Sequence, residues 1–206
     1  FLGSSDSQEE FICQQLNPKI NKMFLYMPDQ PTIVKRRFVE VYPFQKLFEV
    51  YVMDDGEGDE AQSEALCASL EAALPTFDVV VVMDYGHGMI SPQAVDILCN
   101  RARFLAVNVQ ANSHNYGFNT ISKYPRADYI CISESEARLD VRGRQVDLKD
   151  LVREVSDRLA CDNILITRGS EGCLSYGKRE GFFEVPALAT HIVDRVGAGD
   201  SVFSVT

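Results

Sequence analysis

Between Asp78 and Thr167 the chain alternates between strand-like and helix-like segments, and this alternation limits the folds open to it more than any other feature. The apolar, β-branched run at 78–83 is typical of a strand that is buried on both faces. Further strands are expected at 104–109, 128–132 and 163–167, with helices at 91–103 and 147–160. Elements in this order build a parallel sheet covered by helices. The sequence therefore predicts the α/β fold class.

The segments on either side of this region are of other kinds. A hairpin-like pair of strands is expected at 172–176 and 181–185. Nearer the N-terminus the sequence predicts a short helix at 8–16, strand-like pieces at 22–27, 32–41 and 46–53, and a helix at 60–74. We expect the strands within about 20–53 to form a small β lid over one edge of the sheet. One domain is expected to cover residues 1–206.

The composition is that of an ordinary globular protein, with 46% hydrophobic and 24% charged residues in a chain of 206. A net charge of −10 argues against nucleic acid as a partner, because binding to a phosphate backbone needs a concentrated basic face. No apolar run reaches the length of about 18 residues that a membrane span needs, and the first residues lack the pattern of a signal peptide. We therefore expect a cytoplasmic protein without a membrane partner.

The cysteines and histidines predict neither a disulfide framework nor a metal centre. The six cysteines are scattered without a Cys-x-x-Cys pair, and most lie in apolar stretches. Buried free thiols are the better interpretation, because a chain of this length can fold without disulfide bonds. The three histidines, His87, His114 and His191, have no metal-ligand spacing, so no structural zinc is expected.

The most distinctive motif, Gly197-Ala198-Gly199-Asp200, follows a strand-like lead-in at 191–193. A turn with two glycines lets backbone N–H groups converge on an anion, at the start of a helix. The amides of the first three motif residues would stabilise the charge on a phosphoryl group in transit, and Asp200 would be the base that takes a proton from an alcohol. The alternative is a glycine C-cap or tight turn, with an acid near a helix N-terminus.

The stretch from Asp194 to Asp200 closely resembles the Asp-Thr-x-Gly-Ala-Gly-Asp signature of the ribokinase-like, or PfkB, carbohydrate kinase family, with Arg195 in place of Thr. The resemblance covers the whole chain, although a complete family member is longer at both ends. It implies a ribokinase-like three-layer fold, with a mostly parallel sheet, helices and a small β lid. It also implies an anion hole at residues 197–199, Asp200 as the catalytic base, and ATP and Mg²⁺ as cofactors.

A second motif, Asp84-Tyr85-Gly86-His87-Gly88, directly follows the valine-rich strand, at the end where open α/β sheets bind ligands. On periodicity alone it is a turn between a strand and a helix. The motif resembles the Asp-Tyr-Gly-Lys-Gly stretch of bacterial heptose-phosphate kinases in the same family, with His87 in place of Lys. The resemblance implies that the acid, the tyrosine and the two glycines of this motif bind the substrate.

Two further places are candidates for substrate contacts. In the segment 108–110, which begins with Asn108, neutral side chains stand where related heptose kinases have Asp-Pro-Lys. The run 35–37 is the densest basic cluster of an acidic chain, which is usual for a solvated face. In the lid interpretation, however, Lys35 and Arg37 share one strand face and could grip a sugar phosphate.

Ser133-Glu134-Ser135-Glu136, after the expected strand at 128–132, has the Ser-x-x-Glu spacing of a capping box. That structural role is sufficient by itself to explain the motif. The motif also aligns with the family's Asn-x-x-Glu element, which is associated with magnesium and phosphate. The resemblance implies that Glu136 organises Mg²⁺, and an outer-sphere position suits an ion that keeps several of its waters.

Thr167-Arg168-Gly169, followed at a spacing of three by Gly172, resembles the family's Thr-x-Gly-x-x-Gly turn, which lines the nucleotide site. The alternative is a β-turn that only joins two strands. Under the resemblance, all four residues are expected to bind the nucleotide. The Arg168 guanidinium is suited to phosphate groups if it points inward.

Together these motifs predict an ATP-dependent kinase that transfers the γ-phosphoryl group to a hydroxyl of a small-molecule sugar or sugar phosphate. The sequence has neither GxxxxGK[ST] nor an early GxGxxG, which argues against Walker-type and NAD-dependent chemistry. The alternative is a catalytically silent sugar- or nucleotide-binding protein with the same fold. Exposed edge strands could also pair with a second copy, which would give a homodimer through the lid strands.

Overall fold

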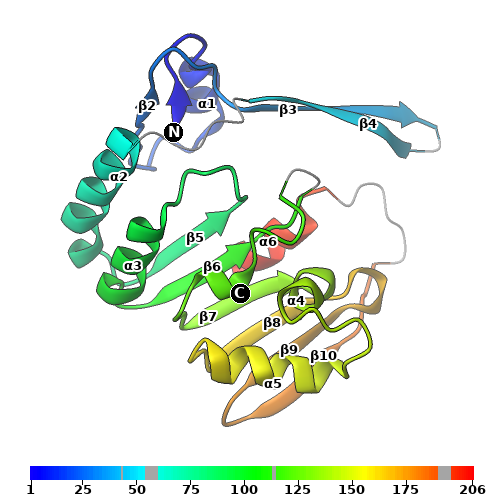
Figure 1. The fold of residues 1–206 in the computed structure, drawn as a ribbon. Coiled ribbons are helices and arrows are strands. Elements are labelled where there is room, and N and C mark those ends of the chain that lie inside the picture. Colours follow the sequence, from blue (N-terminus) through cyan, green and yellow to red (C-terminus); the bar gives the residue numbers. More distant parts are fainter. Residues whose placement is uncertain (43, 54–59, 113–114, 190–195) are drawn as a thin grey trace. The chain divides into compact units, whose positions relative to one another are not determined.

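The computed structural model describes residues 1–42, 44–53, 60–112, 115–189 and 196–206 (Figure 1). The chain divides into two compact units, residues 1–66 and residues 67–206. The first unit contains a short parallel pair of strands and a long antiparallel hairpin, and the second contains a six-stranded sheet. The single domain expected over residues 1–206 stays a prediction, because two compact units can belong to one domain or to two.

The six strands of the second unit have the order β10-β9-β8-β7-β6-β5 (Figure 1). They are β5 (Val80–Asp84), β6 (Leu105–Val109), β7 (Tyr129–Ser133), β8 (Asn163–Thr167), β9 (Cys173–Gly177) and β10 (Gly181–Val185). The first four pair in parallel, whereas β9 and β10 extend the sheet in antiparallel fashion from β8. Every strand predicted for this region is confirmed, including the hairpin-like pair.

Capped helices connect the parallel strands. They are α3 (Pro92–Arg101) between β5 and β6, and α4 (Glu134–Asp140) and α5 (Leu148–Arg158) between β7 and β8. The Ser91 hydroxyl accepts the Ala94 amide at the start of α3, at 3.2 Å. Asp147 accepts the amides of Lys149 and Asp150 at the start of α5. Each such cap stabilises a helix by about 1 kcal/mol, so local sequence defines where these helices begin.

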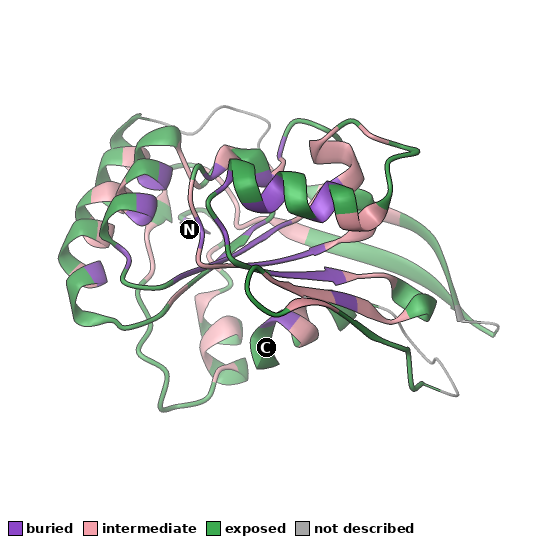
Figure 2. Cartoon of the chain, turned by 90° about the horizontal axis from the view of Figure 1, so that it is seen from below, coloured by how far each residue is buried: buried purple, intermediate pink, exposed green. Residues whose placement is uncertain are grey.

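Both faces of the central strands are buried, and alternate residues enter different clusters. On β7, Ile130 and Ile132 join the larger cluster, to which α3 and α5 contribute. Cys131 lies between them in the sequence and packs instead in a smaller cluster with Phe203 of α6 (Ala198–Val205). Figure 2 shows buried residues along the strands and on the sides of the helices that face them. Helices on both faces of the sheet make the three layers that were predicted.

One face of β5 is open, which corrects the prediction of a strand buried on both faces. Val82 and Asp84 are buried, whereas Val81 and Met83, on the opposite face, are 57% and 36% exposed. β5 is the edge strand, and the smaller cluster under the sheet takes its strand residues from β6, β7 and β8. An unbroken run of valines has no alternation of polarity, so it cannot distinguish an edge strand from a central one.

In the first unit, β1 (Leu2–Gly3) pairs in parallel with β2 (Tyr26–Met27), and α1 (Glu9–Gln15) lies between them in the sequence. The helix predicted at 8–16 is confirmed, but only the last two residues of the predicted strand at 22–27 are a strand. The helix predicted at 60–74 is α2 (Glu60–Ala73), which crosses the boundary between the two units.

The strands predicted at 32–41 and 46–53 form the antiparallel hairpin of β3 (Val34–Val41) and β4 (Phe44–Val52). Its register shifts between Phe38 and Val39, where a bulge locally increases the twist. The rings of Phe38 and Phe48 stack across the strands with centroids 4.4 Å apart. This cross-strand pair stabilises the hairpin.

The cysteines are free thiols, of which Cys99, Cys131 and Cys161 are buried and the other three half-buried. Burial raises the pKa of Cys161 to about 12, which keeps its thiol protonated and inert. His114 and His191 lie outside the described residues. Within the parts of the chain that are described, no helix has the length and apolar character that crossing a membrane requires.

Candidate active site

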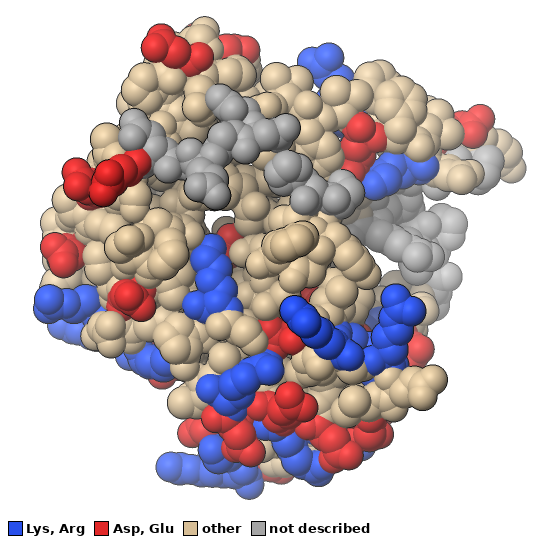
Figure 3. Space-filling view, viewed as in Figure 1, with Lys and Arg blue, Asp and Glu red and all other residues tan. Residues whose placement is uncertain are grey.

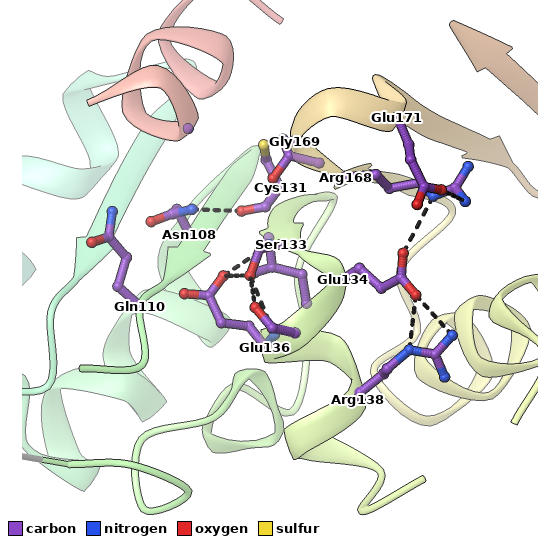
Figure 4. A pocket seen from close by; sticks show the side chains of 14 residues that line it. Asn108, Gln110, Cys131, Ser133, Glu134, Glu136, Arg138, Arg168, Gly169 and Glu171 are labelled. Carbon is purple, nitrogen blue, oxygen red and sulfur yellow. Dashed lines mark hydrogen bonds and ion pairs between the residues drawn. The ribbon is translucent and has the colours of Figure 1, made fainter. Parts of the chain in front are cut away.

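The C-terminal ends of β6, β7 and β8 and the start of α6 surround a cavity of about 650 Å³. Figure 4 shows the polar side chains that line it from these strand ends. Six of the residues predicted for a site are among its lining: Asn108, Glu136, Thr167, Arg168, Gly169 and Gly199. The fold therefore brings parts of four separate sequence motifs to one space.

The predicted base, Asp200, lies in the first turn of α6, directly after Gly199 in the cavity wall. Gly197 precedes the helix with a φ of 75°, a left-handed conformation that favours glycine. Among the described residues no side chain caps this end of α6, so the amides of residues 198–200 have no partner within the helix. Such a helix start attracts anions. The predicted lead-in at 191–193 and the first two residues of the signature stretch, Asp194 and Arg195, lie outside the described residues.

A side chain from the neighbouring strand end holds the Asp200 carboxylate. Gln110, directly after β6, donates a hydrogen bond from Nε2 to Oδ1 of Asp200. Burial and, after it, the negative charge of Asp200 raise the pKa of the Tyr85 hydroxyl. The negative charge of Asp200 therefore acts on the Tyr85 hydroxyl, which stays protonated at neutral pH.

The capping box at the start of α4 is confirmed. Ser133 Oγ accepts the Glu136 amide at 3.2 Å, and Glu136 Oε2 accepts the Ser133 amide and hydroxyl, both at 2.8 Å. The other carboxylate oxygen, Oε1, accepts the Ala111 amide at 3.1 Å. Glu136 therefore joins the end of β7 to the segment after β6, in addition to capping its own helix.

Asn108 is buried in β6, and only one of the two polar atoms of its side-chain amide has a hydrogen-bond partner among the described residues. Its Nδ2 donates to the Cys131 carbonyl oxygen at 2.6 Å, whereas its Oδ1 has no partner among the described residues. A buried acceptor without a partner costs about 1–3 kcal/mol. A donor from a ligand or a water in the cavity would remove that cost.

Charged side chains of both signs line one side of the cavity (Figure 4). Arg168 Nε lies 3.3 Å from Glu134 Oε2, and Arg168 also pairs with Glu171. Arg138 lies 2.8 Å from Glu134 Oε1. Arg168 is thus held by two carboxylates in the cavity wall.

The turn after β8 has the geometry of a tight connection between strands. The Arg168 amide donates to the Gly172 carbonyl oxygen at 2.8 Å. Gly172 has a φ of 89°, and a Cβ at this position would stand 1.9 Å from the Val185 carbonyl oxygen. Gly172 therefore faces the end of β10 and shapes the turn, while Thr167, Arg168 and Gly169 line the cavity.

Asp84, at the end of β5, is 4% exposed, and both of its carboxylate oxygens are engaged within the protein. Oδ1 accepts the Gly86 amide at 2.8 Å and the Asn119 side-chain amide at 3.4 Å. Oδ2 accepts from Lys123 Nζ at 2.8 Å and from the Tyr124 hydroxyl at 2.9 Å. Asp84 therefore has the contacts of a structural residue that holds together the segments around the end of β5.

The partners of Asp84 were not identified from the sequence. Burial, followed by the charge of Asp84 and its hydrogen bond, raises the pKa of the Tyr124 hydroxyl far above its ordinary value. Tyr124 therefore stays a donor at any physiological pH. Lys123 follows Asp84 by 39 residues and belongs to no motif, so only the fold shows their pairing.

The turn after Asp84 depends on glycine at Gly86. Its φ is 69°, and a Cβ there would stand 2.0 Å from Asn115 Nδ2. Asn115 Nδ2 donates to the carbonyl oxygens of Tyr85 and Gly86, at 3.0 and 3.3 Å. Gly88 also has a left-handed φ, of 79°. The conformation predicted for this motif is therefore present, although none of its residues lines the cavity.

Lys35 and Arg37 belong to β3, in the first unit, and share one face of the hairpin. Both pair with Glu49 of β4, as does Lys46 at 3.2 Å. Desolvation alone would raise the pKa of Glu49, but the hydrogen bonds from Arg37 and Lys46 and the charge of Lys35 outweigh it and lower this pKa. One carboxylate among three cations leaves an excess of positive charge on this face.

Acidic and basic side chains are interspersed in the region of α4 and α5 (Figure 3). Several of them are paired, such as Arg153 with Asp150 at 2.7 Å. Paired charges of both signs are typical of a solvated surface. The prediction that the protein does not bind nucleic acid stays a prediction.

Residues 10–205 match the description pfkB family carbohydrate kinase. Two proteins with the name bifunctional protein HldE, from Azotobacter vinelandii and Shewanella baltica, are 30% and 29% identical to the chain over 206 residues. The matches cover 98% of this chain but only 41% of each relative. The chain therefore spans less than half the length of these relatives.

Solved structures of kinases are similar in fold. Ribokinase from Giardia lamblia has a TM-score of 0.68 at 21% identity, over 98% of this chain and 62% of that one. A putative phosphofructokinase from Staphylococcus aureus has a TM-score of 0.69 at 17% identity, over 100% of this chain and 66% of that one. The ribokinase-like fold is confirmed by this likeness. Because the family match takes in nearly all of the sequence, the chain belongs to the pfkB family of carbohydrate kinases.

Proposed function

We propose that the chain is the core of an ATP-dependent kinase that transfers the γ-phosphoryl group to a hydroxyl of a sugar or sugar phosphate. The observation that carries the proposal is the shared cavity. Gly199, which precedes Asp200 at the start of α6, lines the same space as Arg168 and Glu136. The cavity wall thus contains the proposed nucleotide turn and the residue directly before the proposed base. Membership of the pfkB family supports the same class of reaction.

In the proposed reaction, Asp200 takes the proton of the attacking hydroxyl while the hydroxyl oxygen forms a bond to the γ-phosphorus. The bond between that phosphorus and the β,γ-bridging oxygen breaks, and ADP leaves with the electron pair. The amides of residues 197–199 donate to the phosphoryl oxygens, whose negative charge they stabilise without rearrangement. Thr167, Arg168 and Gly169 are proposed to contact the nucleotide, in a turn that Gly172 shapes.

The residues present fit a magnesium ion that is held through water. Hard oxygen donors suit Mg²⁺, and Glu136 supplies a carboxylate in the cavity. Its Oε2 already accepts two hydrogen bonds and its Oε1 one, so one lone pair of Oε1 is left for a metal-bound water. The ion, when bound with the nucleotide, neutralises phosphate charge. We propose that Glu136 orients its hydration shell.

For the acceptor we propose a sugar phosphate of the heptose-phosphate kind. The motif from Asp84 to Gly88 and the likeness to the two HldE proteins support this choice. Asn108 Oδ1 is a buried acceptor in the cavity lining and suits a substrate hydroxyl. Asp84, Gly86 and Gly88 are proposed to act through the shape of the β5 turn, and Tyr85 through its place near Asp200.

The direct test is acceptor-dependent release of ADP by the full-length protein. ATP, Mg²⁺ and a panel of aldoses, ketoses and their phosphates are supplied one acceptor at a time. We expect one acceptor to accelerate ADP release well above the rate with water, and phosphorus NMR to show a new phosphate ester. Tight binding of nucleotide and sugars without ADP release would instead identify a catalytically silent binding protein.

Lys35 and Arg37 on β3 provide a test of whether the hairpin contacts the acceptor as a lid. If Lys35 and Arg37 bind the phosphate of the acceptor, replacing both with Ala should raise the acceptor KM by about 10²- to 10⁴-fold, because each of the two charge-assisted contacts contributes about 1.5–3 kcal/mol. The KM for ATP should change little. Arg36→Ala is the matched control, since Arg36 lies on the other face of β3. Equal effects on both KM values would remove the pair from the acceptor site.

We also propose that the hairpin mediates a homodimer. A two-stranded ribbon is marginally stable by itself, and this one exposes Phe48, Val50 and Val52 by 54%, 43% and 44%. A second copy of the hairpin would cover such a surface. Analytical ultracentrifugation should find a dimer that Phe48→Glu converts to a monomer. A wild-type monomer at micromolar concentration would contradict the proposal.

A further inference from the structure

We propose that Gln110 is the residue that positions the base, by fixing one oxygen of the Asp200 carboxylate so that the other faces the acceptor hydroxyl. The inference rests on the proposed function, because it assigns a task to a neighbour of the proposed base. Gln110 stands where the related heptose kinases have Lys, so the resemblance of the sequence gives no role to an amide at this position.

The first support is the contact itself. Gln110 and Asp200 are 90 residues apart in the sequence, and the fold brings them together at the cavity, where Gln110 and Gly199 are both part of the wall. Gln110 donates from Nε2 to Oδ1 of Asp200. Both side chains are half-buried. A hydrogen bond between an amide and a carboxylate is charge-assisted, and it is stronger in such a site than at an open surface.

The second support is the way in which the Gln110 backbone is anchored. Its N–H donates to the Asp84 carbonyl oxygen at 2.9 Å, which fixes it to β5. The next amide, of Ala111, donates to Glu136 Oε1 at 3.1 Å, which fixes the chain to α4. Asp84 is itself held by Lys123. The Gln110 side chain therefore extends from a backbone that is tied on two sides, and it loses little further freedom when it binds Asp200.

The chemistry of the pair suits a base. A carboxylate oxygen that accepts a fixed hydrogen bond is oriented, and its partner oxygen is left to accept the substrate proton. The donor is a neutral amide, so it supplies no positive charge that would pair with the carboxylate. Asp200 lies in the first turn of α6 between small residues, and Gly199 and Gly197 would meet nothing within 4 Å if they carried a Cβ. At the start of α6, the side chain of Gln110 therefore orients the Asp200 carboxylate.

The kinetic test uses Gln110→Leu in the full-length protein. We expect kcat to fall about 10- to 100-fold, the range for losing one hydrogen bond to a charged group, with the KM values for ATP and acceptor nearly unchanged. Gln110→Lys keeps a donor of similar reach but adds a positive charge that pairs with the carboxylate, so it should recover only part of kcat. Asn163→Leu is the matched control, because this exposed amide lies at the other end of β8. An unchanged kcat in Gln110→Leu would overturn the proposal.

A double substitution separates positioning from direct contact with substrate. In an Asp200→Asn background, Gln110→Leu should reduce the residual rate only slightly, because residues that act as a unit are not additive. A full loss of 10- to 100-fold in that background would show that Gln110 acts by itself and would overturn the inference. The proposed function fails separately, if the wild type releases no ADP or if Asp200→Asn retains full turnover.

The contact can also be measured without turnover. The side-chain amide resonances of Gln110, assigned by their loss in Gln110→Leu, should shift in Asp200→Ala. Those of Gln93, an exposed glutamine of α3, should stay in place. Gln110 resonances that do not respond to Asp200→Ala would overturn the inference, whatever the enzymatic activity of the protein.

Discussion

Asp200→Asn in the full-length protein is expected to lower kcat by about 10²- to 10⁴-fold, the contribution of a positioned general base. The substituted side chain keeps an oxygen that can accept from Gln110, and its place in the first turn of α6 is unchanged. What it loses is the negative oxygen that takes the proton from the acceptor. The loss should therefore appear in kcat, measured as ADP release with saturating ATP and acceptor.

Binding should survive this substitution. The proposed nucleotide contacts come from Thr167, Arg168 and Gly169, and among the described residues the side chain of Arg168 pairs with Glu134 and Glu171, away from the hydrogen bond between Gln110 and Asp200. The dissociation constant of ATP, from calorimetry, should therefore remain close to that of the wild type. Asp157→Asn on α5 is a control that removes the same charge from the surface, and it should leave kcat unchanged. Retained turnover in Asp200→Asn would exclude this residue as the base.

The fold could be predicted because its signals are local. β6, β7 and β8 are short apolar runs, and the caps of α3 and α5 are single residues, Ser91 and Asp147, directly before the first turn. Each of these signals depends on residues within a few positions of one another, so the sequence alone contains the information that defines the strand or helix. The open face of β5 depends instead on which strand is last in the sheet. The position of a strand at the edge is set when the sheet assembles, and the run of valines gives no sign of that position.

The candidate site could be predicted only as a set of separate motifs. Strand ends in a parallel sheet lie at one edge, which is why Asn108, Glu136 and Thr167 were expected near one another and do line one cavity. The contacts between motifs could not be predicted. Arg168 pairs with Glu134 at a separation of 34 residues, and Gln110 bonds Asp200 at a separation of 90. Such pairs are set by register and helix placement, and no spacing in the sequence encodes them.

Asp84→Ala is expected to destabilise the second unit by about 3 kcal/mol, because it leaves buried donors without their acceptor. The Tyr124 hydroxyl is fully buried, and the Gly86 amide and Lys123 would lose the same carboxylate. The lower end of the range for breaking a buried pair applies, since the Lys123 side chain is 27% exposed and can partly reach water. For a protein of this size the change corresponds to a fall in Tm of about 6–12 °C.

The measurement is thermal unfolding of the full-length protein, followed by calorimetry or circular dichroism. Asp78→Ala is the matched control, because Asp78 pairs with Arg103 at the surface, where the two side chains are 90% and 63% exposed. That change should cost less than about 1 kcal/mol. A drop in Tm for Asp84→Ala with a nearly unchanged acceptor KM in the folded protein would give Asp84 a structural task. An unchanged Tm with a large rise in acceptor KM would instead show that the Asp84 carboxylate leaves Lys123 and Tyr124 to bind the substrate directly.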